Sequence, residues 1–287
     1  MTRAIRQRRG TFAVLRLSKR TNFNQSNIKN MMTNYLIPKT LSALLMVGLL
    51  GAQTAQADAH MHTDPSISTG FLMGQFDPAK RDDFSKISTR YASRSGMYMQ
   101  NMAYDAFKAM HRDAELAGVK LVIKSAARNF YQQKAIWEGK WDGKRSVGGI
   151  RNIQKTIKDP VLRARKILEY SSMPGSSRHH WGTDIDLNSF NNSYFASGTG
   201  KRVYDWLVQN APRYGFCQPY TAKSELRPTG YNEEKWHWSF RPLSQQYTAQ
   251  SRLRVYDAMF SGFRGSETAQ GIGIVENYVL GINPVCN

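Results

Sequence analysis

The chain has 287 residues, which is enough for one well-cored domain with appendages, and a formal net charge of +19. The charge is uneven, because residues 1–57 hold nine Lys or Arg and no acid, which leaves +10 (19 − 9) for the remainder. The sequence shows no internal repeat, no low-complexity tract and no glycine-rich phosphate-binding loop. Nothing in it therefore supports nucleotide chemistry.

Residues 31–57 have the three parts of a secretory signal peptide. Lys39 supplies the positive charge, residues 41–52 form an apolar run, and residues 55–57 are a small-residue cleavage site. The apolar run is too short to span a membrane. We therefore expect a periplasmic or otherwise exported protein that starts near Asp58 and has no stable membrane span after cleavage.

Residues 1–30 form a basic extension in front of this signal. Because a signal peptide normally begins close to the initiating Met, we interpret the extension as untranslated, with Met31 or Met32 as the true start. A basic arm that binds nucleic acid or a membrane is the alternative. Export from Asp58 would exclude nucleic acid as a partner.

Residues 58–80 are polar, contain Pro and Gly and lack a sustained period, which predicts a flexible lead-in. Cleavage after Ala57 would expose Asp58-Ala59-His60, whose amine, two backbone amides and imidazole suit a square-planar copper or nickel chelate. An unligated tail is the alternative.

Hydrophobic periodicity predicts helices and short strands in the rest of the chain. Helices are expected at residues 97–116, 130–141, 160–170, 203–214, 245–260 and 267–280, and strands at 120–125, 183–187 and 236–240. This succession predicts an α+β fold, in which a small antiparallel sheet has helices packed on its outer face.

Residues 177–186 place two imidazoles and two carboxylates within ten positions. If the segment ends in a strand, its period of two puts Asp184 and Asp186 on the same face. Gly182 permits the tight bend that turns His179 back over that face. This stretch therefore predicts a metal site.

Residues 234–240 predict a second half-buried strand, in which aromatic residues alternate with polar ones. His237 then faces the same side as the acids, and Glu234 lies three residues before it. Two His and one Asp with a nearby Glu form the set that a catalytic zinc needs: three ligands, an open position and a base. Either cluster alone is more typical of a structural role, whereas the two together favour metal. His180 points away and is not expected to be a ligand.

These motifs resemble a known family. The pattern Ser-x-His-x-x-Gly-x-Asp-x-Asp at residues 177–186, followed by Glu-x-Trp-His at 234–237, is similar to the VanY-like D-alanyl-D-alanine carboxypeptidases. These are zinc peptidases of the LAS superfamily, which also includes penicillin-insensitive murein endopeptidases and the hedgehog signalling domain. A third block, residues 125–133, matches the family's Ser-x-x-Arg-x-x-x-x-Gln. Asp184 stands where the carboxypeptidases usually have Ala and is more like the murein endopeptidases.

The resemblance implies a LAS/hedgehog-like metallopeptidase fold, one Zn²⁺ ion and hydrolysis of D-Ala-D-Ala bonds in peptidoglycan stem peptides. We expect the protein to be a monomer. The implied metal ligands are His179, Asp186 and His237, with Glu234 as general base and Arg128 stabilising the oxyanion. The implied substrate-binding residues are Ser125, Gln133, Ser177, Asp184 and Trp236. Asp184 alternatively orients a ligand histidine.

Two other functions remain open for the same site. One is a D,D- or L,D-endopeptidase that cuts peptidoglycan cross-links. The other is a non-catalytic zinc-containing domain that binds the cell wall, against which the presence of Glu234 argues.

The expected zinc peptidase domain covers residues 81–243, and residues 244–287 form a helical extension packed on it. Cys217 and Cys286 both lie in the exported part. In an oxidising compartment they are expected to pair, which would tie the C-terminus back to the domain. Zinc ligation by the cysteines is the weaker alternative, because no Cys-x-x-Cys spacing is present.

Overall fold

A computed structural model of the protein describes residues 64–287. The predicted signal peptide, the basic extension and the Asp58-Ala59-His60 terminus lie outside the described residues. From residue 64 onward the expectation of a flexible lead-in is wrong. Helix α1 (Thr69–Leu72) is capped by Ser68, and its Phe71 and Leu72 are buried in the core. This apolar segment is too short to show a period in the sequence.

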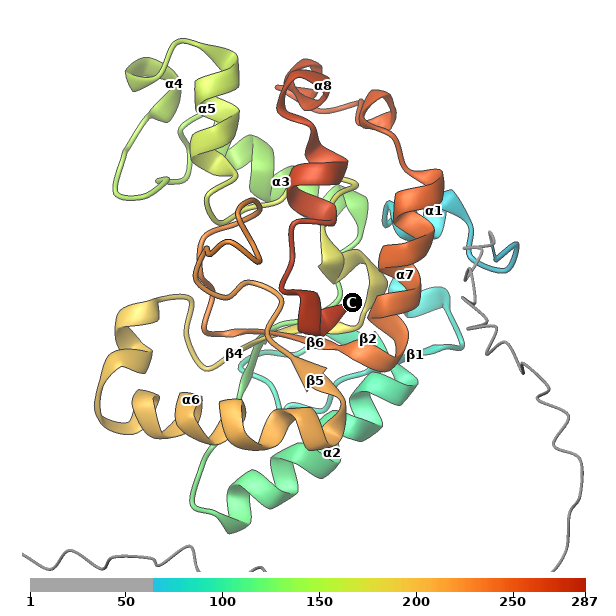
Figure 1. The fold of residues 1–287 in the computed structure, drawn as a ribbon, viewed down its shortest axis with the longest axis vertical. Helices are drawn as coiled ribbons and strands as arrows, with labels where there is room; N and C mark the ends of the chain where they lie inside the picture. Colours follow the sequence, from blue (N-terminus) through green and yellow to red (C-terminus); the bar gives the residue numbers. More distant parts are fainter. Residues whose placement is uncertain (1–63) are drawn as a thin grey trace, which may run out of the picture. The chain divides into compact units, whose positions relative to one another are not determined.

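A four-stranded antiparallel sheet lies at the centre of the described part (Figure 1). Its strands are, in spatial order, β3 (Ile123–Ser125), β4 (Asp184–Leu187), β6 (His237–Phe240) and β5 (Phe216–Cys217). A separate antiparallel pair joins β1 (Phe84–Lys86) to β2 (Tyr98–Gln100). The three strands predicted from the sequence are confirmed, and the expected α+β architecture with them.

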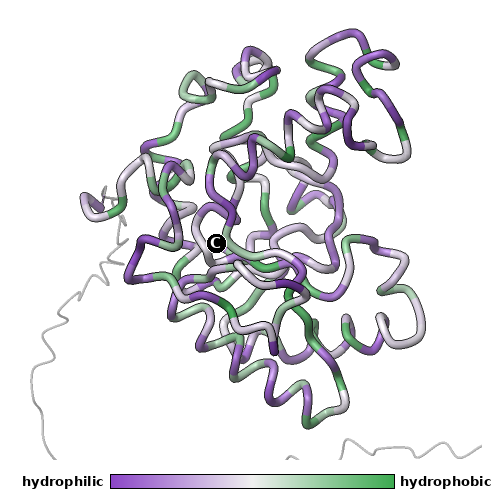
Figure 2. The backbone as a smooth tube through the Cα atoms, turned by 180° about the vertical axis from the view of Figure 1, so that it is seen from behind, coloured by the Kyte–Doolittle hydropathy of each residue, from purple (hydrophilic) through white to green (hydrophobic). Residues whose placement is uncertain are grey.

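One face of the four-stranded sheet packs on helices α2 (Asn101–Leu116) and α6 (Gly198–Asn210) (Figure 1). Ile185 from β4 and Trp238 from β6 share a core with Phe107 of α2 and Leu207 of α6. Hydrophobic and hydrophilic residues are interleaved along these helices (Figure 2), as amphipathic packing requires. The polar side chains of the strands are thereby directed to the opposite face.

A second core includes Phe71 and Leu72 of α1 and residues of the remaining helices. These helices are α3 (Phe130–Trp141), α4 (Ile153–Thr156), α5 (Pro160–Ile167), α7 (Arg241–Arg254) and α8 (Ala269–Ile272), followed by a π-helical turn at Val275–Val279. The prediction of one continuous helix over residues 267–280 is wrong. Gly273, whose φ is +71°, ends α8 and breaks the run. In the part of the chain that the structure describes, no helix has the length and apolar character needed to cross a membrane.

The predicted pairing of Cys217 with Cys286 is confirmed, with 5.7 Å between the two Cα atoms. The bridge joins β5 to Cys286, which is buried one residue before the C-terminal residue, across a sequence separation of 69. Replacing both cysteines by Ser is expected to lower the free energy of unfolding by up to about 4 kcal/mol, because the unfolded chain gains loop entropy. Urea unfolding measures this loss, and a dithiol reductant should affect the wild type but not the variant. An unchanged midpoint would contradict the expectation.

Candidate active site

The register of the sheet brings three of the predicted site residues side by side. Asp186 on β4 is paired with Ser125 on β3 and with His237 on β6. Residues directly opposite each other in an antiparallel sheet point to the same face. The central strand therefore carries a carboxylate that has a histidine beside it on the neighbouring strand.

His179 reaches the same point from a short 3₁₀ turn, Arg178–Trp181, that precedes β4. The turn ends at Gly182, where φ is +71° and a Cβ atom would lie 2.2 Å from the Phe84 ring. Only glycine satisfies both conditions. The resulting bend places His179 Nε2 3.3 Å from Asp186 Oδ2, as the sequence predicts.

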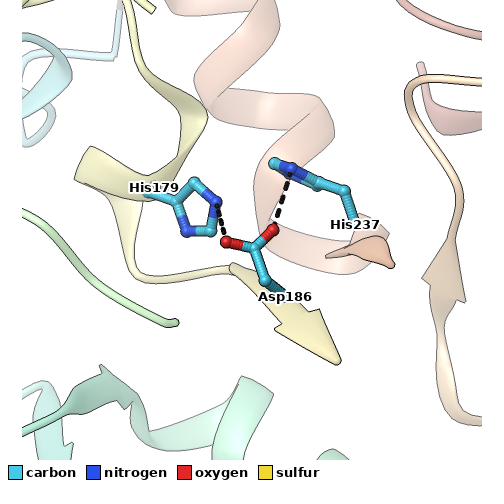
Figure 3. A group of neighbouring side chains, drawn as sticks. All are labelled: His179, Asp186 and His237. Atoms are coloured by element: carbon cyan, nitrogen blue, oxygen red, sulfur yellow. Dashed lines mark ion pairs between the residues drawn. The ribbon is translucent and has the colours of Figure 1, made fainter. Parts of the chain in front are cut away.

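The carboxylate of Asp186 lies between the two imidazoles (Figure 3). His237 Nδ1 is 3.4 Å from Asp186 Oδ1, and one donor atom from each of the three residues lies within 4.8 Å of the other two. Among the described residues, Asp186 Oδ1 is buried without a hydrogen-bond partner. A buried carboxylate oxygen of this kind, facing two imidazoles, suits a divalent metal ion.

Each imidazole has a hydrogen-bond acceptor at its outer nitrogen. His179 Nδ1 lies 2.9 Å from the carbonyl oxygen of Ala126, and His237 Nε2 lies 2.9 Å from Asp184 Oδ2. A carbonyl oxygen only accepts a hydrogen bond, so His179 Nδ1 carries the proton, and Nε2 of the neutral ring has a lone pair that faces Asp186. His237 has a carboxylate at each nitrogen, and although burial lowers the pKa of this ring, its hydrogen bonds to Asp184 and Glu234 raise it to about 9. A metal ion at Nδ1 would displace the proton there, and the Nε2 proton would stay on the hydrogen bond to Asp184. Two imidazole nitrogens and one carboxylate form a ligand set that zinc accepts.

Asp184 is buried behind these ligands. Its Oδ2 atom accepts a hydrogen bond from Arg178 Nε at 3.1 Å, and both side chains are fully buried. The guanidinium also donates to Ser239 Oγ and to Thr248 Oγ1, each at 2.8 Å. Burial alone would raise the pKa of Asp184, but Arg178 and the hydrogen bond from His237 hold this pKa well below its usual value. The geometry favours the alternative in which Asp184 orients His237.

Glu234 lies at the entrance to β6, with Oε2 3.1 Å from His237 Nδ1. Burial raises the pKa of this carboxyl group, whereas the hydrogen bond to His237 opposes the rise. A carboxylate with a raised pKa accepts a proton more readily near neutral pH, as a general base must.

Arg128 immediately precedes Asn129, the N-cap of α3, which forms a reciprocal capping box with Gln132. The Arg128 Nε–H donates to Gln133 Oε1 at 3.1 Å, and one terminal nitrogen donates to Ser125 Oγ. The same nitrogen lies 3.5 Å from Asp186 Oδ2. The guanidinium is thus held at the edge of the candidate metal-ligand set.

His180 is not part of the candidate metal-ligand set and instead hydrogen-bonds to the backbone. Its Nε2 atom accepts a hydrogen bond from the Gly175 backbone N–H at 3.0 Å, so Nδ1 donates to the Arg128 carbonyl oxygen at 2.6 Å. Burial lowers the pKa of this imidazole to about 3, which keeps it neutral. His180 therefore fixes the backbone of Arg128.

A cavity of about 690 Å³ opens over the site. Eight of the predicted site residues line it, namely Ser125, Arg128, Gln133, His179, Asp186, Glu234, Trp236 and His237. Ser177 and Asp184 do not line it. Arg178 and Lys140 were not among the site residues predicted from the sequence. Lys140 was discoverable in principle, because it lies seven residues after Gln133 and therefore on the same face of α3.

The chain matches the family model of VanY, described as D-alanyl-D-alanine carboxypeptidase, over residues 96–243, a little more than half of its length. YodJ of Bacillus subtilis (strain 168), whose name classes it provisionally as a carboxypeptidase, is 30% identical over 142 residues, which are 49% of this chain and 45% of YodJ. The D-alanyl-D-alanine carboxypeptidase of Enterococcus faecalis (strain ATCC 700802 / V583) is 36% identical over 70 residues, 24% of each chain. This chain therefore aligns with less than half the length of each of these curated relatives.

Among solved structures, the chain is similar to a mutant of the vancomycin-resistance D,D-pentapeptidase VanY, from a VanB-type resistance cassette, in complex with Zn(II). The identity is 23%, the TM-score is 0.41, and the match covers 59% of this chain and 86% of the other. The family match over more than half of the sequence, which contains all three motifs, shows that this chain belongs to the VanY family of D-alanyl-D-alanine carboxypeptidases.

Proposed function

We propose that this protein is an exported zinc-dependent D,D-carboxypeptidase that removes the terminal D-alanine from peptidoglycan stem peptides. The observation that supports this most strongly is the group formed by His179, Asp186 and His237, whose donor atoms lie within 4.8 Å of one another under a cavity that Glu234 also lines. Membership of the VanY family supports the peptidase chemistry.

His179 Nε2, Asp186 and His237 Nδ1 would hold one zinc ion. When bound there, zinc supplies a Lewis acid that polarises the scissile carbonyl and acidifies water. Glu234 accepts the proton of the attacking water and afterwards returns it to the leaving amine. Arg128 donates hydrogen bonds to the oxyanion that develops on the carbonyl oxygen.

Charge and export agree with this substrate. Residues 58–287 carry a net charge of +10 (19 − 9), and fixed positive charge raises the local concentration of an anionic cell-wall polymer. The predicted signal peptide at residues 31–57 would deliver the chain to that polymer.

Product analysis tests the proposal against endopeptidase activity at the same site. The zinc-loaded chain is incubated separately with a pentapeptide ending in D-Ala-D-Ala and with a cross-linked muropeptide dimer, and the products are identified by mass spectrometry. A carboxypeptidase releases free D-alanine from the pentapeptide. Monomers from the dimer without free D-alanine would instead establish an endopeptidase.

Replacing Arg128 by Lys is expected to reduce kcat by about 10²–10³-fold with little change in bound zinc, because one ammonium cannot reproduce the two-pronged guanidinium. Arg112→Lys is the matched control, since that side chain is 70% exposed on α2. Steady-state kinetics and zinc analysis of both variants check the prediction. Equal kcat values for the two variants would remove Arg128 from the mechanism.

A further inference from the structure

The cavity over the metal-ligand set has more positive than negative side chains. Two acids line it, Asp186 and Glu234. Five cations line it: Arg94, Lys124, Arg128, Lys140 and Arg145. A bound divalent metal ion would add further positive charge. The cavity is therefore suited to a peptide with more than one negative group.

Lys140 differs from Arg128 in how its charge is balanced, and it is less exposed than Arg94 and Arg145. It lies in the last turn of α3, is half-buried, and donates a hydrogen bond from Nζ to the buried Ser171 hydroxyl. Among residues 64–287, no ion pair joins Lys140 to a carboxylate, whereas Arg128 lies 3.5 Å from Asp186. The hydroxyl of Ser171 only partly replaces the water that such an ammonium loses on burial.

The charges around Lys140 also disfavour its protonated, positively charged form. Burial lowers the pKa of its ammonium, and the neighbouring positive charges of Arg145 and Arg128 act in the same direction. The charge of Glu234 opposes them. An ammonium held in this position without a counter-ion lowers the free energy of unfolding. This indicates that a bound ligand supplies the negative group that pairs with Lys140.

We propose that Lys140, together with Ser171, forms a carboxylate-binding subsite of the cavity that is separate from Arg128. The ammonium and the hydroxyl proton of Ser171, which is free to turn, can both donate to one carboxylate. In a stem peptide this group is either the C-terminal carboxylate or the carboxylate of an acidic residue. The inference rests on the proposed function, because it assumes a peptide in the cavity.

Binding measurements separate the two sources of the carboxylate. The probes are a pentapeptide with one acidic residue and a D-Ala-D-Ala end, the same peptide with a C-terminal amide, and a third with the internal acid as its amide. Each is titrated by calorimetry into zinc-loaded Glu234→Gln protein, with and without Lys140→Met. Lys134→Met is the matched control, since Lys134 is on α3 but does not line the cavity.

Lys140→Met is expected to weaken binding of the parent peptide by about tenfold to a hundredfold, the value of a charge-assisted hydrogen bond. The loss should disappear for one amide and persist for the other, and the amide for which it disappears identifies the carboxylate that Lys140 holds. Equal affinities of Lys140→Met and Lys134→Met protein for the parent would overturn the proposal, as would an equal loss on all three peptides. Failure of the proposed function would be observed separately from failure of this subsite. In that case the zinc-loaded wild-type protein would not hydrolyse the parent peptide.

Discussion

Replacing Glu234 by Gln is expected to reduce the release of D-alanine by about 10²–10⁴-fold, because the amide cannot accept a proton from water. The bound zinc should remain near one ion per chain, since Glu234 is not among the three residues that form the candidate ligand set. Its carboxylate lies 3.1 Å from His237 Nδ1, close enough to reach a water in the same space. Activity and zinc content are measured on the same preparation.

Glu233→Gln is the matched control for this substitution, because Glu233 is the preceding residue and does not line the cavity. The control should retain wild-type activity. If Glu234→Gln protein hydrolyses the peptide as fast as the control, another group must accept the proton. If it instead loses zinc and activity together, Glu234 supports the ligand set and the assignment as base fails.

Replacing Asp184 by Ala is expected to lower the free energy of unfolding by about 3–5 kcal/mol, because it leaves the Arg178 guanidinium buried without its carboxylate. Arg178 is 1% exposed, so water cannot take the place of the lost oxygen. His237 also loses the acceptor that holds its Nε2 proton, and zinc affinity should fall by about 10–100-fold. Urea unfolding and competition with a zinc chelator measure the two effects.

A surface pair provides the control for the stability change. Lys201 and Asp205 lie 2.6 Å apart, but both are about half exposed, and Asp205→Ala should change stability by less than about 1 kcal/mol. In a double-mutant cycle, adding Arg178→Met to Asp184→Ala should recover part of the lost stability, since the unpaired charge is removed. Strictly additive losses would show that Asp184 and Arg178 do not act as a pair.

Local patterns in the sequence were sufficient for the part of the site that lies on strands. A period of two places Asp184 and Asp186 on one face, and the alternation in residues 234–240 places His237 on the same face as those acids. Gly182 stands at the bend that turns His179 back. Each of these inferences concerns residues that are close in the sequence, and for such residues the backbone geometry determines which side chains share a face.

Features that depend on tertiary packing could not be obtained in this way. Besides Asp184, the Arg178 guanidinium contacts Ser239 on β6 and Thr248, which lies 70 residues further along on α7. The tautomer of His179 depends on a carbonyl group 53 residues earlier, at Ala126. Most Arg residues are on the surface, so the sequence gives no reason to choose Arg178 over the others.

The two wrong predictions, a continuous helix over residues 267–280 and a flexible segment up to residue 80, also come from relying on the local sequence pattern. Residues 267–280 contain apolar residues at helical spacing, yet Gly271 and Gly273 lie among them, and the structure forms the short helix α8 and a separate π-helical turn. Periodicity alone gave these glycines too little weight. Residues 64–80 lack any period because α1 makes only one turn before it packs on the core.

The most direct test of the central claim is to measure D-alanine release and bound zinc together. The purified chain is stripped with a chelator, zinc is restored in steps, and both quantities are determined at each step with a pentapeptide ending in D-Ala-D-Ala. Activity is expected to rise in proportion to zinc and to saturate at one ion per chain, and His237→Ala protein should neither bind the ion nor gain activity. Full activity in the stripped chain, or in His237→Ala protein, would contradict the zinc-dependent mechanism.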